Sequence, residues 1–264
     1  MKLARRILVT NDDGINAPGL AILEDVAAEL SDDVWTVAPE FEQSGASHSL
    51  TLADPLRLRQ LTERRFAIHG TPTDCVMMAV RHILEDGKPE LVLSGVNRGQ
   101  NLADDVNYSG TVAGAMEGAA LGIPSIALSQ AFNIHTPGGP AFDTAREQAG
   151  WVIADLLTAG WPAGVLLNVN FPDLPGRDDL QIAVTVQGKR DESANIIEER
   201  KDPRGISYFW IGFRRERQEA PPGSDLRAVF DGKISVTPLH LDRTHEASRH
   251  ALATRLSQAR RRVG

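Results

Sequence analysis

Short apolar runs alternate with stretches of helical periodicity through the first half of this chain, and this alternation restricts the fold more than any other sequence feature. The apolar runs are residues 7–10, 34–38, 66–68, 91–93 and 125–128, and the helical stretches are residues 20–30, 74–84 and 110–121. Strands that alternate with helices are typical of a mostly parallel sheet with helices on both faces. We therefore predict an α/β fold of the doubly wound, Rossmann-like, three-layer type.

The second half of the chain is less regular. We expect helices at residues 141–157 and 246–262, and strands at residues 165–169, 181–186 and 234–237. Residues 188–223 are rich in charge, Gly and Pro around one apolar island, residues 208–211. This composition predicts a projecting β-hairpin arm. Because exposed aromatic groups are costly in water, we expect another surface, in this chain or in a partner, to cover the island.

Composition excludes several classes of function. The chain has 28 Lys and Arg against 35 Asp and Glu, a net charge of -7, which argues against a protein that coats a nucleic-acid polymer. Cys75 is the only cysteine, so an intramolecular disulfide is impossible and a thiolate metal cluster is disfavoured. No apolar run approaches the roughly 20 residues of a membrane span, and the first residues do not resemble a secretory signal. We expect a cytoplasmic protein without a membrane partner.

Polar loops that contain glycine follow the predicted strands. They are residues 11–14, 39–47, 70–74 and 94–101, the last continuing to residues 108–111. In open parallel sheets, ligands bind beyond the carboxyl ends of the strands. These loops are therefore predicted to converge on one cleft, and we expect residues 1–135 to carry the site within a single domain of residues 1–264.

Asp12 and Asp13 are adjacent acids directly after the first predicted strand. Two neighbouring carboxylates repel each other unless a positive charge lies beside them, and a hard divalent cation supplies that charge. Ser44 and Asn97 offer further oxygen ligands from other loops. Without a His/Cys cluster of zinc spacing, Mg²⁺ or Mn²⁺ is favoured over Zn²⁺. The alternative is a simple turn in which Asp13 caps the following helix.

Ser109, Gly110 and Thr111 precede a helix of small residues. Free N–H groups and two hydroxyls at a helix N-terminus make an anion site, and Gly110 permits close approach of a phosphate. The alternative is an ordinary N-cap. Asn101 is either a turn residue or a donor to a phosphoryl oxygen. Two glycines inside the helix, Gly114 and Gly118, are expected to permit close packing.

The remaining reactive side chains give weaker signals. No histidine stands in a defensible Ser/His/Asp order, although His245 lies at a predicted strand-to-helix junction from which it could reach the cleft. The alternative is a surface residue in the first turn of the last helix. Cys75 is expected to be a buried small apolar residue, because no base accompanies it.

Five motifs together resemble the SurE family of survival-protein nucleotidases. They are residues 7–14, 37–47, 70–76, 94–101 and 108–112, and weaker matches continue through residues 202–205, 208–212 and 236–239. The resemblance covers nearly the whole chain. It implies a phosphatase that hydrolyses nucleoside 5′- and 3′-monophosphates with one divalent cation, Mg²⁺ or Mn²⁺, per subunit. It also implies a homodimer or homotetramer in which arms such as residues 188–223 exchange between subunits.

The resemblance implies roles for eight residues. The metal ligands correspond to Asp12, Asp13, Ser44 and Asn97, and the phosphate-binding residues correspond to Asn101, Ser109, Gly110 and Thr111. One position departs from the pattern. Some members carry a functional histidine where this chain has Glu246, and the histidine here, His245, is one place earlier.

For catalysis we expect four residues to act, namely Asp12, Asp13, Asn101 and Ser109. One of the paired aspartates is the predicted general base, and attack by water is preferred to an acid-anhydride intermediate on Asp12. Two alternatives stay open. One is a phospho-aspartyl phosphotransferase of the haloacid-dehalogenase type, although its acids are spaced Asp-x-Asp. The other is a non-catalytic nucleotide-binding scaffold.

Overall fold

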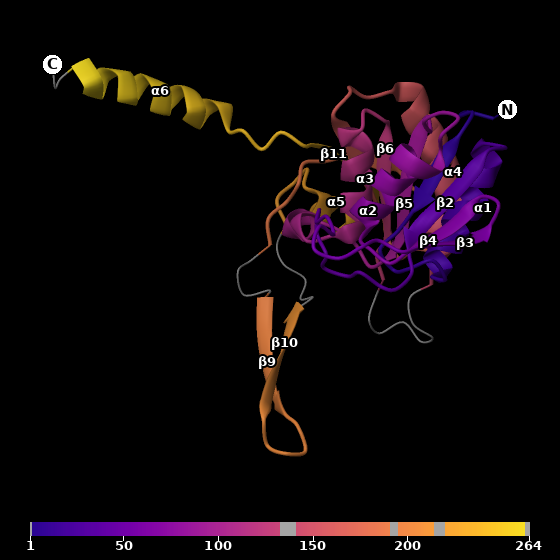
Figure 1. Cartoon of the computed structure of the whole chain (residues 1–264). Helices are drawn as coiled ribbons and strands as arrows, with labels where there is room; N and C mark the ends of the chain where they lie inside the picture. The colour runs from indigo at the N-terminus through magenta and orange to yellow at the C-terminus, as the bar shows by residue number, and fades with distance from the viewer. Residues whose placement is uncertain (1, 133–140, 191–194, 214–219, 262–264) are drawn as a thin grey trace.

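The computed structural model describes every residue except 1, 133–140, 191–194, 214–219 and 262–264 (Figure 1). Among the described residues, nine strands form one sheet. Their order is β3 (Leu58–Thr62), β4 (Arg65–Ile68), β2 (Val34–Pro39), β1 (Ile7–Thr10), β5 (Leu91–Arg98), β6 (Ser125–Gln130), β7 (Val165–Phe171), β11 (Ile234–His240) and β8 (Ile182–Val184).

The strands from β4 to β7 are parallel, whereas β3 and β11 run antiparallel to their neighbours β4 and β7. The first strand, β1, pairs with β2 on one side and with β5 on the other. The sheet therefore grows in opposite directions from β1, and the crevice between β1 and β5 is the topological switch point at which such sheets bind ligands.

Helices cover both faces of the sheet. On one face lie α1 (Pro18–Leu30) and α4 (Asp143–Ala159), which share a large apolar cluster with β1, β5 and β6. On the other face lie α2 (Pro72–Met78) and α3 (Gly110–Ala120), each with its own apolar cluster against the sheet. The fold prediction of a doubly wound, mostly parallel, three-layer structure is confirmed.

Several element boundaries differ from the sequence prediction. The helix expected at residues 74–84 is α2 followed by a π-helical turn at Ala79–Ile83. The fourth predicted strand continues as β5 to Arg98, through an irregularity in its pairing with β6 between Ser94 and Asn97. Strand β3, the short 3₁₀ helix η2 (Ala103–Asn107) and the short helix α5 (Asp225–Phe230) were not expected, because none of them shows a long apolar period.

The expected arm is present as a hairpin of β9 (Asn195–Lys201) and β10 (Ser207–Phe213). Both the hairpin and the C-terminal helix α6 (Glu246–Arg261) extend away from the sheet (Figure 1). The apolar side chains of β10 are largely exposed, including Trp210 and Ile211. No helix within the described parts of the chain has the length and apolar character needed to cross a bilayer.

Candidate functional site

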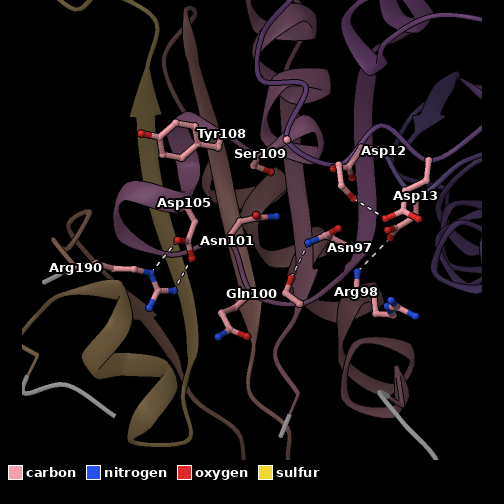
Figure 2. A pocket seen from close by; sticks show the side chains of 14 residues that line it. Asp12, Asp13, Asn97, Arg98, Gln100, Asn101, Asp105, Tyr108, Ser109 and Arg190 are labelled. Atoms are coloured by element: carbon pink, nitrogen blue, oxygen red, sulfur yellow. Dashed lines mark hydrogen bonds and ion pairs between the residues drawn. The ribbon is translucent and has the colours of Figure 1, made fainter. Parts of the chain in front are cut away.

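A cavity of about 340 Å³ lies at the carboxyl ends of β1 and β5, at the switch point of the sheet (Figure 2). Its walls come from the loops after β1 and β2, the end of β5 with the loop that follows it, η2, the N-cap of α3, and Arg190. The lining residues are Asp12, Asp13, Glu42, Ser44, Gly45, Asn97, Arg98, Gly99, Gln100, Asn101, Asp105, Tyr108, Ser109 and Arg190. All four predicted metal ligands therefore border the same cavity.

Asp12 follows β1 and is buried under the N-terminus of α3. The hydroxyl of Thr111 donates a hydrogen bond to Oδ1 of Asp12 at 2.5 Å. A Cβ atom on Gly110 would lie 2.7 Å from Cβ of Asp12, so this position accommodates the carboxyl group only as glycine. The start of α3 thus fixes the orientation of Asp12.

Asp13 is less buried and points toward β5 (Figure 2). Its Oδ2 accepts a hydrogen bond of 3.2 Å from the backbone N–H of Arg98. The N-cap of α1 is Ala17, so Asp13 does not cap the following helix. The alternative interpretation of the Asp-Asp pair as a cap is therefore wrong.

Asn97 and Ser44 each leave an oxygen lone pair available. The amide Nδ2 of Asn97 donates to the backbone carbonyl of Gly99 at 2.8 Å, which leaves Oδ1 as an acceptor. Figure 2 shows this side chain beside the two aspartates. The hydroxyl of Ser44 donates to Oε1 of Glu42 at 2.8 Å, so its oxygen can still act as a ligand.

The two aspartates carry perturbed acidities. Burial raises the pKa of Asp12 from 3.8 to about 7; hydrogen bonding from Thr111 opposes this rise and the charge of Asp13 adds to it. Burial also raises the pKa of Asp13, against the effect of the Arg98 N–H bond. Both rises come mainly from burial, and the groups of the protein that favour the charged form do not fully offset it.

The donor set fits a hard divalent cation. Two carboxylates, one hydroxyl and one amide carbonyl are oxygen ligands of the kind that Mg²⁺ and Mn²⁺ prefer. Four carboxylates and only two guanidinium groups line the cavity. Among the described residues, no group of three or more His, Cys, Asp or Glu could hold a metal ion. A site at Asp12 and Asp13 would thus depend on Ser44 and Asn97 as well.

The predicted phosphate-binding residues fall into two groups. Ser109 lines the cavity and caps α3, since its Oγ accepts a hydrogen bond from the backbone N–H of Val112 at 3.0 Å. Gly110 and Thr111 do not line the cavity, because they pack directly against Asp12. Phosphate contacts by these two residues stay a prediction, and in this structure they support Asp12.

Asn101 is fixed by a buried network at the ends of β6 and β7. Its backbone N–H donates to Oδ1 of Asn170 at 2.8 Å, and its carbonyl accepts from Nδ2 of both Asn168 and Asn170. Its side-chain Nδ2 donates to Oγ of Ser129 at 2.8 Å. Four hydrogen bonds thus hold Asn101, which also lines the cavity.

The weaker candidates lie elsewhere. His245 is exposed at the start of α6 and hydrogen-bonds Oγ of Ser248 at 2.6 Å, and it does not line the cavity. Cys75 is fully buried in α2, as expected, and burial raises the pKa of its thiol. Gly114 and Gly118 face Ser94 and Ser125 of the sheet so closely that a Cβ atom would clash, which confirms their packing role.

Sequence reasoning missed three residues at the other end of the cavity. Asp105 and Tyr108 belong to η2 and its C-cap, and Arg190 comes from the root of the hairpin arm. Tyr108 stands within a motif already noted, so its position was detectable. Arg190 carries no local signal, because its partners lie about 85 positions earlier in the chain.

Comparison with known proteins identifies the family. The sequence profile described as Survival protein SurE matches residues 7–194, which is well over half of the chain. This chain belongs to the SurE family. A protein of Azorhizobium caulinodans named 5′-nucleotidase SurE is 60% identical over 253 residues, which cover 96% of this chain and 98% of the relative.

Two further matches agree. A protein of Parvibaculum lavamentivorans, also named 5′-nucleotidase SurE, is 58% identical over 94% of this chain and 89% of its own length. The crystal structure of the SurE protein from Aquifex aeolicus superposes with a TM-score of 0.80 at 40% identity, covering 93% of this chain and 97% of that one. The resemblance drawn from the sequence motifs is confirmed.

Proposed function

We propose that this chain is a phosphoric monoester hydrolase that cleaves nucleoside 5′- and 3′-monophosphates to nucleoside and phosphate. One observation carries the proposal: Asp12 and Asp13 lie at the switch point of the sheet, in one cavity with Ser44 and Asn97. Membership of a family whose relatives are named 5′-nucleotidase supports the choice of substrate.

Asp12, Asp13, Ser44 and Asn97 would hold one divalent cation, Mg²⁺ or Mn²⁺, per subunit. When bound, the cation neutralises charge on a phosphoryl oxygen and acts as a Lewis acid. The residues fit this role because all four carry oxygen ligands and line one cavity in which carboxylates outnumber guanidinium groups.

The remaining phosphoryl oxygens would bind on the α3 side of the cavity. The hydroxyl proton of Ser109 is free to donate, since its Oγ acts only as an acceptor toward Val112. The fixed amide of Asn101 lies between Ser109 and Asn97 (Figure 2) and would orient the phosphate or the attacking water. Such donors stabilise charge that develops during phosphoryl transfer.

Hydrolysis then requires two proton transfers and one substitution at phosphorus. One of the paired aspartates takes a proton from water, whose oxygen forms the new bond to phosphorus as the bond to the nucleoside oxygen breaks. The leaving oxygen takes up a proton. Oδ1 of Asp12 accepts a hydrogen bond from Thr111, and the carboxyl group packs against Gly110. We therefore favour attack by water over phosphoryl transfer to Asp12.

We also propose that residues 1–264 form one SurE-like domain that assembles as a homodimer or homotetramer through the β9–β10 hairpin. Supporting this, the hairpin extends from the sheet and exposes Ile197, Phe209, Trp210 and Ile211. Association with a second copy would remove these side chains from water. A cytoplasmic location stays a prediction.

The function is tested by hydrolysis of 5′-AMP and p-nitrophenyl phosphate with Mn²⁺, with EDTA, and with the variant Asp13→Asn. Loss of one ligand charge should lower kcat/KM by more than about a hundredfold for both substrates, and EDTA should abolish turnover. Asp179→Asn, at an exposed carboxylate paired with Arg177, is the matched control and should remain active. Near-normal turnover by folded Asp13→Asn would overturn the proposed site.

A further inference from the structure

The cavity has a second end that the hydrolytic chemistry does not use. Figure 2 shows Asn101 and Ser109 in the middle, with Asp12 and Asp13 on one side and Asp105, Tyr108 and Arg190 on the other. The following inference rests on the proposed function. If the phosphate binds between Asp12 and Ser109, the rest of the substrate extends either toward Arg190 or out of the cavity.

Arg190 is firmly held at this end. Its Nε and Nη2 donate to the two oxygens of Asp105 at 2.8 and 2.5 Å, which is the bidentate geometry of a strong ion pair. Its backbone N–H donates to Oδ2 of Asp104 at 2.8 Å. Its side chain is only 16% exposed, so the guanidinium is held within the cavity wall and is not a freely moving surface group.

The segment before Arg190 is joined to η2 by further bonds. One carboxylate, that of Asp225, accepts from the backbone N–H of Gly188 at 2.9 Å and from that of Ala103 at 2.8 Å. The amide of Gln187 donates to the carbonyl of Ala103 at 3.0 Å. The root of the arm and η2 therefore form one rigid wall, which presents Arg190 in a fixed orientation.

The guanidinium keeps donors for a ligand. Arginine has five N–H groups, and the bonds to Asp105 use one on Nε and one on Nη2. Asp105 also neutralises its charge, which weakens its attraction for a phosphate dianion. The remaining donors therefore suit uncharged acceptors, such as sugar hydroxyl oxygens and the carbonyl or ring nitrogen atoms of a base.

Tyr108 lines the same end of the cavity and is 55% exposed, so its aromatic side chain is accessible to a ligand. We infer that Arg190 is a substrate-contacting residue that binds the nucleoside half of the substrate, with Tyr108 beside it. This assigns the two ends of the cavity to the two halves of a nucleoside monophosphate.

The test compares two substrates that differ in their leaving group. Arg190→Gln should lower kcat/KM for 5′-AMP by about tenfold through a higher KM, which is equivalent to about 1.4 kcal/mol. For p-nitrophenyl phosphate, kcat/KM should change by less than about twofold. Arg190→Lys, which retains the charge beside Asp105 but not the planar fork, should fall between wild type and Arg190→Gln. Arg177→Gln breaks a similar bidentate pair, with Asp179, outside the cavity and should change neither substrate.

Calorimetry on the metal-free protein separates this inference from the proposed function. Arg190→Gln should weaken binding of adenosine, which carries no phosphate for the carboxylates of the metal-free cavity to repel, whether or not the enzyme turns over. An equal loss of kcat/KM for 5′-AMP and p-nitrophenyl phosphate would indicate that Arg190 only stabilises the cavity wall, and it would overturn the inference. Unchanged kinetics and unchanged adenosine binding would also overturn it, while wild-type hydrolysis of 5′-AMP would leave the proposed function intact.

Discussion

At the residue scale, the buried carboxyl group of Asp12 lowers the stability of the metal-free protein, and the proposed cation site uses the same group. The fold buries its carboxyl group beside Asp13, and the hydroxyl of Thr111, a neutral group, donates a hydrogen bond to it. Burial raises its pKa to about 7. Ionising this group in the metal-free protein therefore costs free energy, and a bound cation would recover that cost.

The sign of the pH dependence follows from this shift. Below about pH 4, Asp12 is neutral in both the folded and the unfolded chain and has no effect on stability. Between its unfolded pKa of 3.8 and its folded pKa of about 7, the unfolded chain releases the proton first. The free energy of unfolding of the metal-free protein therefore falls as pH rises through this window, and stays lowered above it.

Asp12→Asn should stabilise the metal-free protein. The amide keeps an oxygen for the Thr111 hydroxyl but never ionises, so we expect the melting temperature to rise by about 5 °C at about pH 8, and by less at about pH 5. Differential scanning calorimetry in EDTA measures this. With Mn²⁺ added, wild type should gain stability and the variant should not. A variant less stable than wild type at both pH values would contradict this account of Asp12.

At the scale of elements, one face of α3 is a close packing surface against the sheet. Gly110, Gly114 and Gly118 lie four residues apart on one face of this helix, and added Cβ atoms would strike Asp12, Ser94 and Ser125. This stripe brings the helix close to the sheet. Its N-terminus then lies directly over the carboxyl end of β1.

Gly114→Ala should therefore destabilise the protein although alanine favours helices. Its Cβ would lie 2.7 Å from Oγ of Ser94 and 3.0 Å from Cγ2 of Thr10, both fully buried, so we expect the melting temperature to fall by about 2–6 °C. In α4, the matched control Gly150→Ala meets only the mobile end of Glu29 at 3.3 Å. It should leave the melting temperature unchanged or raise it, and equal losses in both variants would refute the packing argument.

At the scale of the whole molecule, the β9–β10 hairpin leaves large apolar side chains exposed to water in an isolated chain. Phe209 and Ile211 project from one side of β10 and are 61% and 78% exposed. Side chains of this size seldom stay in water on a monomer when they are adjacent. We therefore expect a partner surface to cover the hairpin, and we propose that a second copy of the chain supplies it.

The double variant Phe209→Ser and Ile211→Ser should weaken this self-association. We expect sedimentation velocity to show a shift from dimer or tetramer toward monomer, with circular dichroism unchanged because the hairpin contributes little to the core. Arg177→Gln, an exposed change outside the hairpin, should leave the assembly unaltered. A wild-type chain that sediments as a monomer would reject the proposed assembly.

The sheet and the gathering of Asp12, Asp13, Ser44 and Asn97 at one cavity could be predicted because their signals are local. Continuous apolar runs mark β1 and β5, and the polar loops follow them directly in the sequence. Strand β3 escaped prediction because it is an edge strand with mostly exposed, polar side chains. Arg190 escaped because only the folded chain brings it to Asp105.

The two ends of the cavity are built from separate stretches of polypeptide. Asp12 and Asp13 follow β1 and Asn97 lies on β5, whereas η2 and residues 187–190 form the opposite wall, joined through Asp225. Substitutions in that wall leave the central strands untouched. A protein engineer could therefore seek new leaving-group preferences there by mutagenesis while retaining an inherited reaction centre.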